Sequence, residues 1–431
     1  EPFEAFKHQF MYVRDGRLAN MDFPGNLAVW ALDHLLGLQG GLFSLATALS
    51  ALGIALFLNF RLSMGWALLG VLLFWISPMA SSLSFSTHQH QLSRAAFSLF
   101  LVGTWFAYEN QKARWWLFSG FFASLMALFR PLEATFLISP FFIFLVNRFL
   151  KKTNKKSHLD LLLFLIGALP LVLLFAWYNH QLTGQWWLSP RFAIPEVSDD
   201  VSTVFSLQKL WLRFSTNMGE NLFLLLFWPL GPLGLVLFLL GVGEDRFTKC
   251  LGLGVACDLV LGLLHDIPGI NVVGPIHYSE CVIPIIILGV HGVHRLLTAT
   301  FLTPHWRQTI RACGLTALSL GMGLFSWHHW SALHDSAKIA DSIHGAIELR
   351  LADAKPSIIA GPTYLETWQN IPRFLARGTW VYEWPTVSPG FSDPVIFAAS
   401  GHEEALRKKF PERDFYRLIL KPEYPYLDLL K

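Results

Sequence analysis

Ten apolar segments between residues 41 and 327 restrict the fold more strongly than any other feature of this chain. A lipid bilayer gives the backbone no hydrogen-bond partners, so such segments cross it as helices of ~20 residues each. We expect the shorter segments to extend at their ends, to tilt or to stop part way through the bilayer. The segments cover residues 41–58, 66–85, 95–108, 115–129, 134–146, 159–178, 221–241, 250–265, 281–297 and 312–327.

The composition agrees with a membrane protein. Hydrophobic residues make up 53% of the chain and charged residues 15%, whereas about 25% of the residues in a soluble domain are charged. The net charge of +3 gives no indication of nucleic-acid binding. The four cysteines lie in apolar segments and form no CxxC motif, so we interpret them as buried hydrophobic residues. The predicted fold class is an α-helical polytopic membrane protein.

The proline at position 131 leaves two interpretations of the segments on either side of it. A proline inside a helix removes a backbone hydrogen bond and clashes with the preceding turn. The residues from 115 to 146 therefore form either two short helices or one helix that is broken near Arg130.

The distribution of Lys and Arg predicts the orientation in the membrane. Thirteen of them lie in the connections on one side of the ten segments, and five lie in the connections on the other side. Positively charged loops stay on the cytoplasmic face, which places residues 1–38 on the outer, periplasm-like face. The chain starts with Glu rather than Met, and we expect a fragment cut just after one further span.

The opening residues predict two short helices at the outer membrane face. Apolar side chains between Phe3 and Val13 recur at helical spacing, and Gly16 is a suitable end for that helix. A second helix is expected over residues 27–38, with Asn26 as its cap. It is too short to span a bilayer and fits an interfacial or re-entrant position. An ordinary amphipathic loop helix with solvated charges is the alternative. The carboxylates of this stretch are Glu1, Glu4, Asp15 and Asp22.

The composition changes near residue 334. Residues 334–431 contain 25 of the 63 charged residues of the chain and alternate helix-like with strand-like pieces. Strands are expected at 357–360 and 395–399, and helices at 335–353 and 402–410. These pieces predict a small α/β domain on the outer face. The predicted domains are an outer first loop, 1–39, a transmembrane domain, 40–333, and this C-terminal domain, 334–431.

Ionisable residues gather where the apolar segments meet the outer face. Such residues are costly at membrane depth and usually face a cavity, so we expect a polar cavity that opens outward. His88 and His90 have the spacing of a metal-binding pair but lack a third ligand. Arg130 with Glu133 forms either a local ion pair or part of a phosphate site. The other residues of this group are Arg94, His180, Arg191, His277 and Glu280.

Motifs of several common protein classes are missing from the sequence. The chain contains no P-loop, no GxSxG, no HExxH and no GxGxxG in a strand–turn–helix setting. A nucleotide-driven pump and a serine hydrolase are therefore not indicated.

Three short stretches form a recognisable pattern. Residues 13–20 read VRDGRLAN, residues 130–134 read RPLEA, and residues 274–278 read GPIHY, with Pro284 following. With the outer first loop and the C-terminal domain, they resemble the GT-C glycosyltransferases, polyprenyl-phosphate-sugar-dependent membrane enzymes of the mannosyltransferase and aminoarabinose-transferase type. The resemblance covers about residues 1–300. It departs from the family in two places: the Asp of an Asp-Glu pair would precede Glu1, and Ile276-His277 stands where an Arg often precedes the Tyr.

The resemblance implies transfer of a sugar from a polyprenyl-phosphate donor to a hydroxyl of a lipid, glycan or protein acceptor, on the periplasmic side of a bacterial inner membrane. The base would be the Asp before Glu1 or Glu1 itself, because the acceptor oxygen must lose a proton, with Asp22 and Glu4 as alternatives. The charge of the phosphate leaving group requires basic side chains. No metal ligand is assigned, although a divalent metal is a candidate cofactor, and no nucleic-acid partner is expected. The candidate donor-phosphate residues are Arg130, His88, Arg94, His277 and Arg191.

Two other functions also fit the sequence. A transporter or lipid flippase would share the outward polar cavity and the broken helices, but we find no symmetry between halves of the chain, and the C-terminal domain is unnecessary for it. A non-catalytic membrane scaffold whose outer domain binds a partner predicts scattered polar residues instead, with Glu1, Arg130 and His277 more than ~20 Å apart.

Overall fold

The structure is a computed structural model, and it divides the chain into two compact units. A helical unit comprises residues 23–328 with 373–376, and a second unit comprises residues 1–22, 329–372 and 377–431. The structure describes residues 11–14, 17–20, 23–83, 89–109, 112–151, 155–190, 221–243, 245–262, 270–271, 274–300, 302–314, 355–361, 364–368, 379–383, 392–420 and 425–429, together with isolated residues of 211–215 and 316–351.

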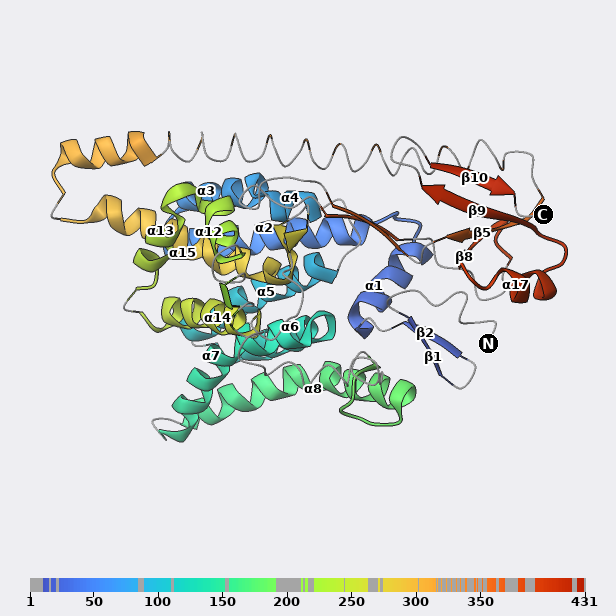
Figure 1. The fold of residues 1–431 in the computed structure, drawn as a ribbon. Coiled ribbons are helices and arrows are strands. Elements are labelled where there is room, and N and C mark those ends of the chain that lie inside the picture. Colours follow the sequence, from blue (N-terminus) through green and yellow to red (C-terminus); the bar gives the residue numbers. More distant parts are fainter. Residues whose placement is uncertain are drawn as a thin grey trace. The chain divides into compact units, whose positions relative to one another are not determined.

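Helices make up most of the first unit (Figure 1). Its helices and short strands, in chain order, are α1 (Pro24–Leu35), α2 (Gly41–Arg61), α3 (Met64–Ile76), α4 (Pro78–Leu83), α5 (Gln89–Glu109), α6 (Arg114–Phe129), α7 (Pro131–Leu150), α8 (Lys155–Thr183), α12 (Leu222–Leu230), η4 (Gly231–Leu233), α13 (Gly234–Gly241), α14 (Arg246–Gly262), β3 (Ile270–Asn271), β4 (Gly274–Pro275), η5 (Ile276–Cys281) and α15 (Val282–Thr298).

Four of the described helices are long and apolar enough to cross a membrane: Gly41–Arg61, Pro131–Leu150, His158–Thr183 and Ile276–Thr298. Helix α8 gives the clearest evidence for a lipid environment, because other parts of the protein bury only 17% of its most apolar stretch. Leu165, Leu169 and Leu173 of α8 are about half exposed, at 48%, 52% and 58%. An apolar surface of this length requires lipid, so the chain is an integral membrane protein, as the sequence predicted.

Two predicted spans are interrupted in the structure. The segment 66–85 divides at Ser77 into α3 and α4, because Pro78 favours an extended backbone at the residue before it (φ −60°, ψ 119°). The segment 221–241 divides at Gly231, whose φ of 69° ends α12. The segments beside Arg130 are two helices, α6 and α7, with Arg130 between them.

Glycines set the closest helix crossings of the unit. A Cβ at Gly120 of α6 would collide with the carbonyl oxygen of Phe164 in α8, and a Cβ at Gly167 of α8 would collide with the carbonyl oxygen of Leu117 in α6. Such reciprocal small residues let two backbones approach closely within a membrane. The same arrangement joins α13 and α15, through Gly241 with Leu288 and Gly292 with Leu237.

The opening segment differs from its prediction. Residues Met11–Arg14 (β1) and Arg17–Asn20 (β2) pair as antiparallel strands, so the helix predicted through Val13 is wrong there. The physical reason is visible in the sequence, because Asp15-Gly16 is a strong signal for a two-residue hairpin turn. The second predicted helix is confirmed as α1, although Phe23 is its N-cap and no side chain caps it. The part of the predicted first helix before Met11 lies outside the described residues.

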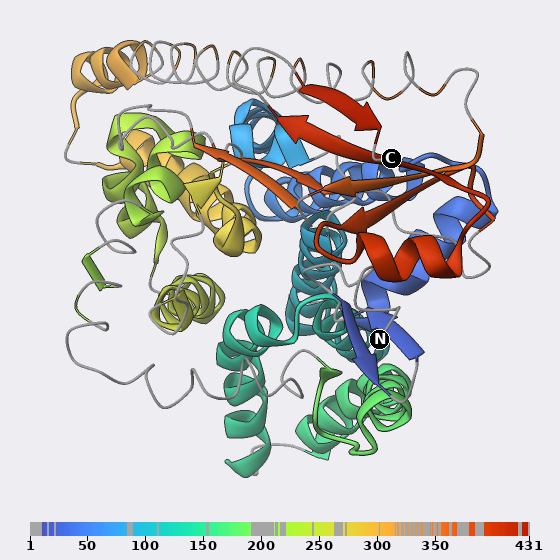
Figure 2. The same cartoon turned by 45° about the vertical axis from the view of Figure 1, so that its right-hand side comes forward.

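The C-terminal residues form the predicted small α/β domain. Its sheet has the order β10-β9-β5-β8, with β5 parallel to β8 and β9, and β10 antiparallel to β9 (Figure 2). Side chains of β5, β8 and β9 and of helix α17 form its apolar core, which includes Ile358, Ile396, Leu406 and Phe415. The elements are β5 (Ser357–Gly361), β8 (Val395–Ala399), α17 (Glu403–Lys409), β9 (Asp414–Leu420) and β10 (Pro425–Leu429), with a separate hairpin β6 (Tyr364–Trp368) and β7 (Thr379–Glu383).

Candidate active site

Arg130 stands at the centre of a buried group of charged side chains in the helical unit. It lies between α6 and α7, directly before Pro131, which occupies the first turn of α7. A residue before proline avoids the helical region, and Arg130 has an extended backbone accordingly (φ −146°, ψ 86°). Only 5% of the residue is exposed, so the guanidinium is held in the interior.

The Arg130 guanidinium joins three separate parts of the chain. Its Nη2 donates to Glu133 Oε1 on α7 and, at 3.5 Å, to the carbonyl oxygen of His277 in η5. Its Nη1 lies 2.8 Å from Nε2 of His90 on α5. Its Nε lies 3.6 Å from Oε1 of Glu280, which is completely buried. The ion pair between Arg130 and Glu133 that the sequence left open is therefore present, and a second carboxylate shares the cation.

The Ser279 hydroxyl joins His90 to the carboxylate of Glu280. The Ser279 hydroxyl lies 3.0 Å from Glu280 Oε2 and 2.9 Å from His90 Nδ1. A serine has one proton to donate, and the carboxylate can only accept it. Both ring nitrogens of His90 also lie within hydrogen-bond distance of Arg130 Nη1. His90 therefore belongs to the same polar network as Ser279, Glu280 and Arg130.

Arg94 is the second buried arginine of the group. It follows His90 by one helical turn on α5 and is 0% exposed. Its Nη1 donates to the carbonyl oxygen of Met79 at 3.2 Å, and its guanidinium carbon lies 5.7 Å from the ring centroid of Phe74. Its Nε and Nη2 have no hydrogen-bond partner among the described residues. These two N–H groups make Arg94 a suitable donor to an anionic ligand.

A third carboxyl group lies beside the cluster on α14. Asp258 is 1% exposed, and its Oδ2 accepts a hydrogen bond from the Cys281 thiol at 3.1 Å. Its Oδ1 has no partner in the part of the chain that the structure describes. Glu133, Glu280 and Arg130 all act on this carboxyl electrostatically. The group of Arg94, Arg130, Glu133, Asp258 and Glu280, with His90, is called the charge cluster below.

The charge cluster suits an anionic ligand better than a metal ion. Guanidinium groups bind phosphate through directed N–H bonds. The described residues contain no group of three His, Cys, Asp or Glu side chains that could hold a metal ion. His88, the other half of the predicted His pair, lies outside those residues.

The structure brings only some of the predicted site residues together. Arg94 and Arg130 belong to the charge cluster, whereas His277 contributes its carbonyl oxygen. The remaining predicted residues lie outside the described part of the chain: Glu1, Glu4, Asp22, His88 and Arg191.

Four members of the charge cluster were not predicted as site residues: His90, Glu133, Asp258 and Glu280. His90 was noted as half of a His pair with metal-binding spacing, Glu133 as a partner of Arg130, and Glu280 only as a polar residue near the membrane face. Asp258 had a usable signal, because a single carboxyl inside an apolar membrane segment usually has a functional role. No sequence signal indicated the pairing of Glu280 with Arg130, because the two residues are 150 positions apart and only the packing of the helices brings them together.

The chain is thus a polytopic membrane protein with a buried cluster of arginines and carboxyl groups. Residues 42–177 match the family described as dolichyl-phosphate-mannose-protein mannosyltransferase. This match covers less than half of the chain and includes His90, Arg94, Arg130 and Glu133. It confirms the resemblance to this class of glycosyltransferases that the sequence predicted.

The chain is also similar to the crystal structure of ArnT from Cupriavidus metallidurans bound to undecaprenyl phosphate, with 14% sequence identity and a TM-score of 0.49. The similarity covers 94% of this chain and 83% of that chain. None of the curated protein sequences matches the chain.

Proposed function

We propose that the protein is an integral-membrane glycosyltransferase that moves a sugar from a polyprenyl-phosphate donor to an acceptor hydroxyl. The observation that carries this proposal is the family match over residues 42–177, which includes the buried Arg130 and its partner Glu133. A family of mannosyltransferases that use dolichyl phosphate mannose needs a site for a lipid phosphate. The two arginines of the charge cluster are suited to that group.

The arginines would act on the leaving group. When the sugar–phosphate bond breaks, negative charge grows on the lipid phosphate, and fixed donors in a water-poor site stabilise it strongly. Arg94 offers two N–H groups that no described residue accepts. Arg130 is already shared by Glu133 and Glu280. A phosphate that binds Arg130 therefore either displaces one of these carboxylates or binds beside them as a third anion. We include His88, His277 and Arg191 as further phosphate contacts on the strength of the sequence.

A carboxylate of the opening segment would act on the acceptor. The acceptor oxygen attacks the anomeric carbon and must lose its proton to a base within hydrogen-bond reach. Glu1 is our first choice, and Asp22 and Glu4 are the alternatives. Removing the charge of the base, as in Glu1→Gln, is then expected to lower turnover while the protein still accumulates in the membrane.

The orientation proposed here places the charge cluster at the outer, periplasmic face of a bacterial inner membrane. Basic side chains gather at the other end of the same helices. Arg61 lies over Trp105 and Arg148 over Tyr108, both near the C-terminal end of α5, whereas His90 is at its N-terminal end. Positive charge stays on the cytoplasmic side, which supports this orientation.

The test uses the protein in membranes with radiolabelled polyprenyl phosphomannose and a panel of other polyprenyl-phosphate sugars. The proposal expects release of lipid phosphate with at least one donor, and loss of this release in the Arg130→Gln variant. Arg61→Gln is the matched control, because it removes an arginine from the opposite end of the helices. Donor-independent movement of lipid across vesicles, with no sugar released from any donor, would favour a flippase instead.

A further inference from the structure

Asp258 is the one carboxyl of the charge cluster that has no cation beside it among the described residues. Glu133 and Glu280 both lie within ion-pair distance of Arg130, but no described Lys, Arg or His lies within 4.0 Å of Asp258. Its only partner there is the Cys281 thiol, a weak donor. Asp258 is nevertheless 1% exposed, so water does not compensate for the missing cation.

Three parts of the chain near Asp258 contribute groups that affect its charge. Helix α7 contributes Glu133, and η5 contributes Tyr278, Glu280 and Cys281. The junction of α6 and α7 contributes Arg130. Two of these neighbours are carboxylates and one is a cation. An ionised Asp258 would thus be buried next to like charges, which is unfavourable, and the neutral acid avoids this cost.

The protonation of Asp258 decides the total charge of the cluster. With Asp258 neutral, the charges of Arg94 and Arg130 balance those of Glu133 and Glu280. With Asp258 ionised, the cluster carries one excess negative charge. A donor phosphodiester brings a negative charge of its own, and two such charges repel strongly where water is excluded.

We propose that Asp258 must carry a proton for a donor phosphate to bind at Arg94 and Arg130, so that it acts as a positioning residue through the two arginines. This inference rests on the proposed function. The proton enters from solvent, remains on the Asp258 carboxyl while the donor is bound and takes no part in bond breaking. The acceptor proton goes to a different carboxylate, in the opening segment.

Asp258 and the proposed catalytic base of the opening segment predict opposite effects of pH on activity, so one pH profile distinguishes their roles. A catalytic base must be ionised, so its loss of function appears on the acidic side of the pH profile. Asp258 must be protonated, so its effect appears on the alkaline side. The donor itself does not contribute, because a phosphodiester stays singly charged over the whole range. The second ionisation of a phosphate monoester, at about pH 6, affects only the released lipid phosphate.

The experiment measures the KM of polyprenyl phosphomannose, or of whichever panel donor the wild-type protein uses, from about pH 6 to pH 10. The wild-type KM is expected to rise on the alkaline side, by up to about tenfold per pH unit for a single linked proton. The Asp258→Asn variant, which is neutral at every pH, is expected to give a KM that does not rise. Cys281→Ser keeps a hydroxyl donor beside Asp258 and is expected to keep the wild-type rise.

Two results would overturn the inference: a wild-type KM that stays flat with pH, or an equal rise in wild type and Asp258→Asn. If Asp258→Asn does not accumulate in the membrane, Asp258→Ser removes the same charge in a smaller side chain and is measured in its place. Failure of the wild-type protein to use any donor is a different result. It contradicts the proposed function itself.

Discussion

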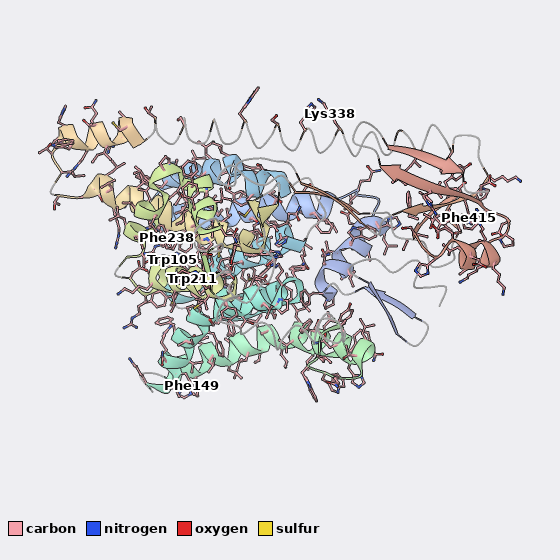
Figure 3. The ribbon with its side chains drawn as sticks, in the orientation of Figure 1. Trp105, Phe149, Trp211, Phe238, Lys338 and Phe415 are labelled. Atoms are coloured by element: carbon pink, nitrogen blue, oxygen red, sulfur yellow. The ribbon has the colours of Figure 1, made fainter. Side chains whose placement is uncertain are left out.

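The helical unit holds two groups of charged side chains, and they are built differently. At one end, Arg61 of α2 pairs with Asp245 at 3.2 Å, and its guanidinium lies 4.5 Å from the ring centroid of Trp105. The side chain of Trp105 is labelled in Figure 3. Asp245 also accepts hydrogen bonds from the backbone of Phe247 and from Thr248. One cation meets one carboxylate, and both have further partners. At the other end, the charge cluster has more carboxyl groups than arginines and leaves donors of Arg94 without an acceptor among the described residues.

The difference supports our proposal that the charge cluster is a functional site and that the Arg61–Asp245 pair only stabilises the fold. Both groups contact α5, on which His90 and Trp105 are 15 positions, or roughly 22 Å, apart. The Arg61–Asp245 pair has side chains that are 14% and 40% exposed, which limits its desolvation cost. The charge cluster is almost completely buried and still incompletely paired. Such incomplete pairing is rare for buried groups and needs an explanation, and a bound anionic ligand is the one that we propose.

The largest expected effect comes from removing the charge of Arg130. In the proposed mechanism, Arg130→Gln deletes a donor to the growing phosphate charge, and loss of such a donor typically costs about 10²–10³-fold in turnover. Sugar release from the donor is the measurement, normalised to the amount of folded protein in the membrane. Arg61→Gln should stay within about twofold of wild type on the same scale. Equal losses in the two variants would mean that both arginines serve stability alone.

Arg130→Gln also leaves two buried carboxylates without a cation, which costs about 3–5 kcal/mol of stability. The double variant Arg130→Gln/Glu133→Gln removes one of these charges along with the arginine. It should recover folded protein without recovering sugar release. Recovery of both would show that Arg130 acts only by neutralising Glu133.

Removing the charge of Glu280 should have the opposite sign on donor binding. Glu280 is completely buried and lies beside both Arg130 and His90. Glu280→Gln gives the cluster one more unit of positive charge, and a unit charge at about 10 Å and an effective dielectric constant of about 20 changes anion affinity by roughly tenfold. The donor KM should therefore fall by about that factor. A KM that rises would assign Glu280 to holding Arg130 in place.

Sequence patterns predicted the helices better than their interruptions. Continuous apolar runs identified α2, α6 and α15 to within a few residues, because membrane helices need such runs. The breaks at Ser77 and Gly231 and the hairpin of residues 11–20 were missed, although Pro78, Pro232 and Asp15-Gly16 signalled them. In each case a local backbone rule decided the structure and hydrophobicity did not.

The candidate site was predictable only as single residues. Arg94 and Arg130 were predicted because charges at membrane depth are rare enough to indicate function. The partnerships of Arg130 with Glu280 and of Cys281 with Asp258 join helices far apart in the chain. Such pairs depend on helix crossings like the glycine contact of α6 with α8, which no local pattern reveals.

Breaking the Arg61–Asp245 pair should reduce stability slightly and leave activity intact. Arg61→Gln removes a partly exposed ion pair and a cation–π contact, which together contribute about 1–2 kcal/mol. The expected result is a melting temperature a few degrees lower, measured on the purified protein in detergent. Asp245→Asn should give a similar, smaller shift. A change of more than about tenfold in sugar release would show that the two charged groups are coupled along the helices.

The smallest expected effect is the acid dependence of that pair. Partial burial raises the pKa of Asp245, but hydrogen bonds from Thr248 and Arg61 outweigh it and lower the pKa to about 2. An unfolded Asp has a pKa of about 3.9, so the folded state gains stability from ionised Asp245 above about pH 4. This gain is lost as the pH falls through about 2. The difference in melting temperature between wild type and Asp245→Asn should therefore shrink with acidification over that interval. A difference in melting temperature that stays constant with pH would mean that Asp245 stabilises the fold through its hydrogen bonds and that its charge contributes nothing. The Arg61–Asp245 pair and the charge cluster would then differ only in how deeply they are buried.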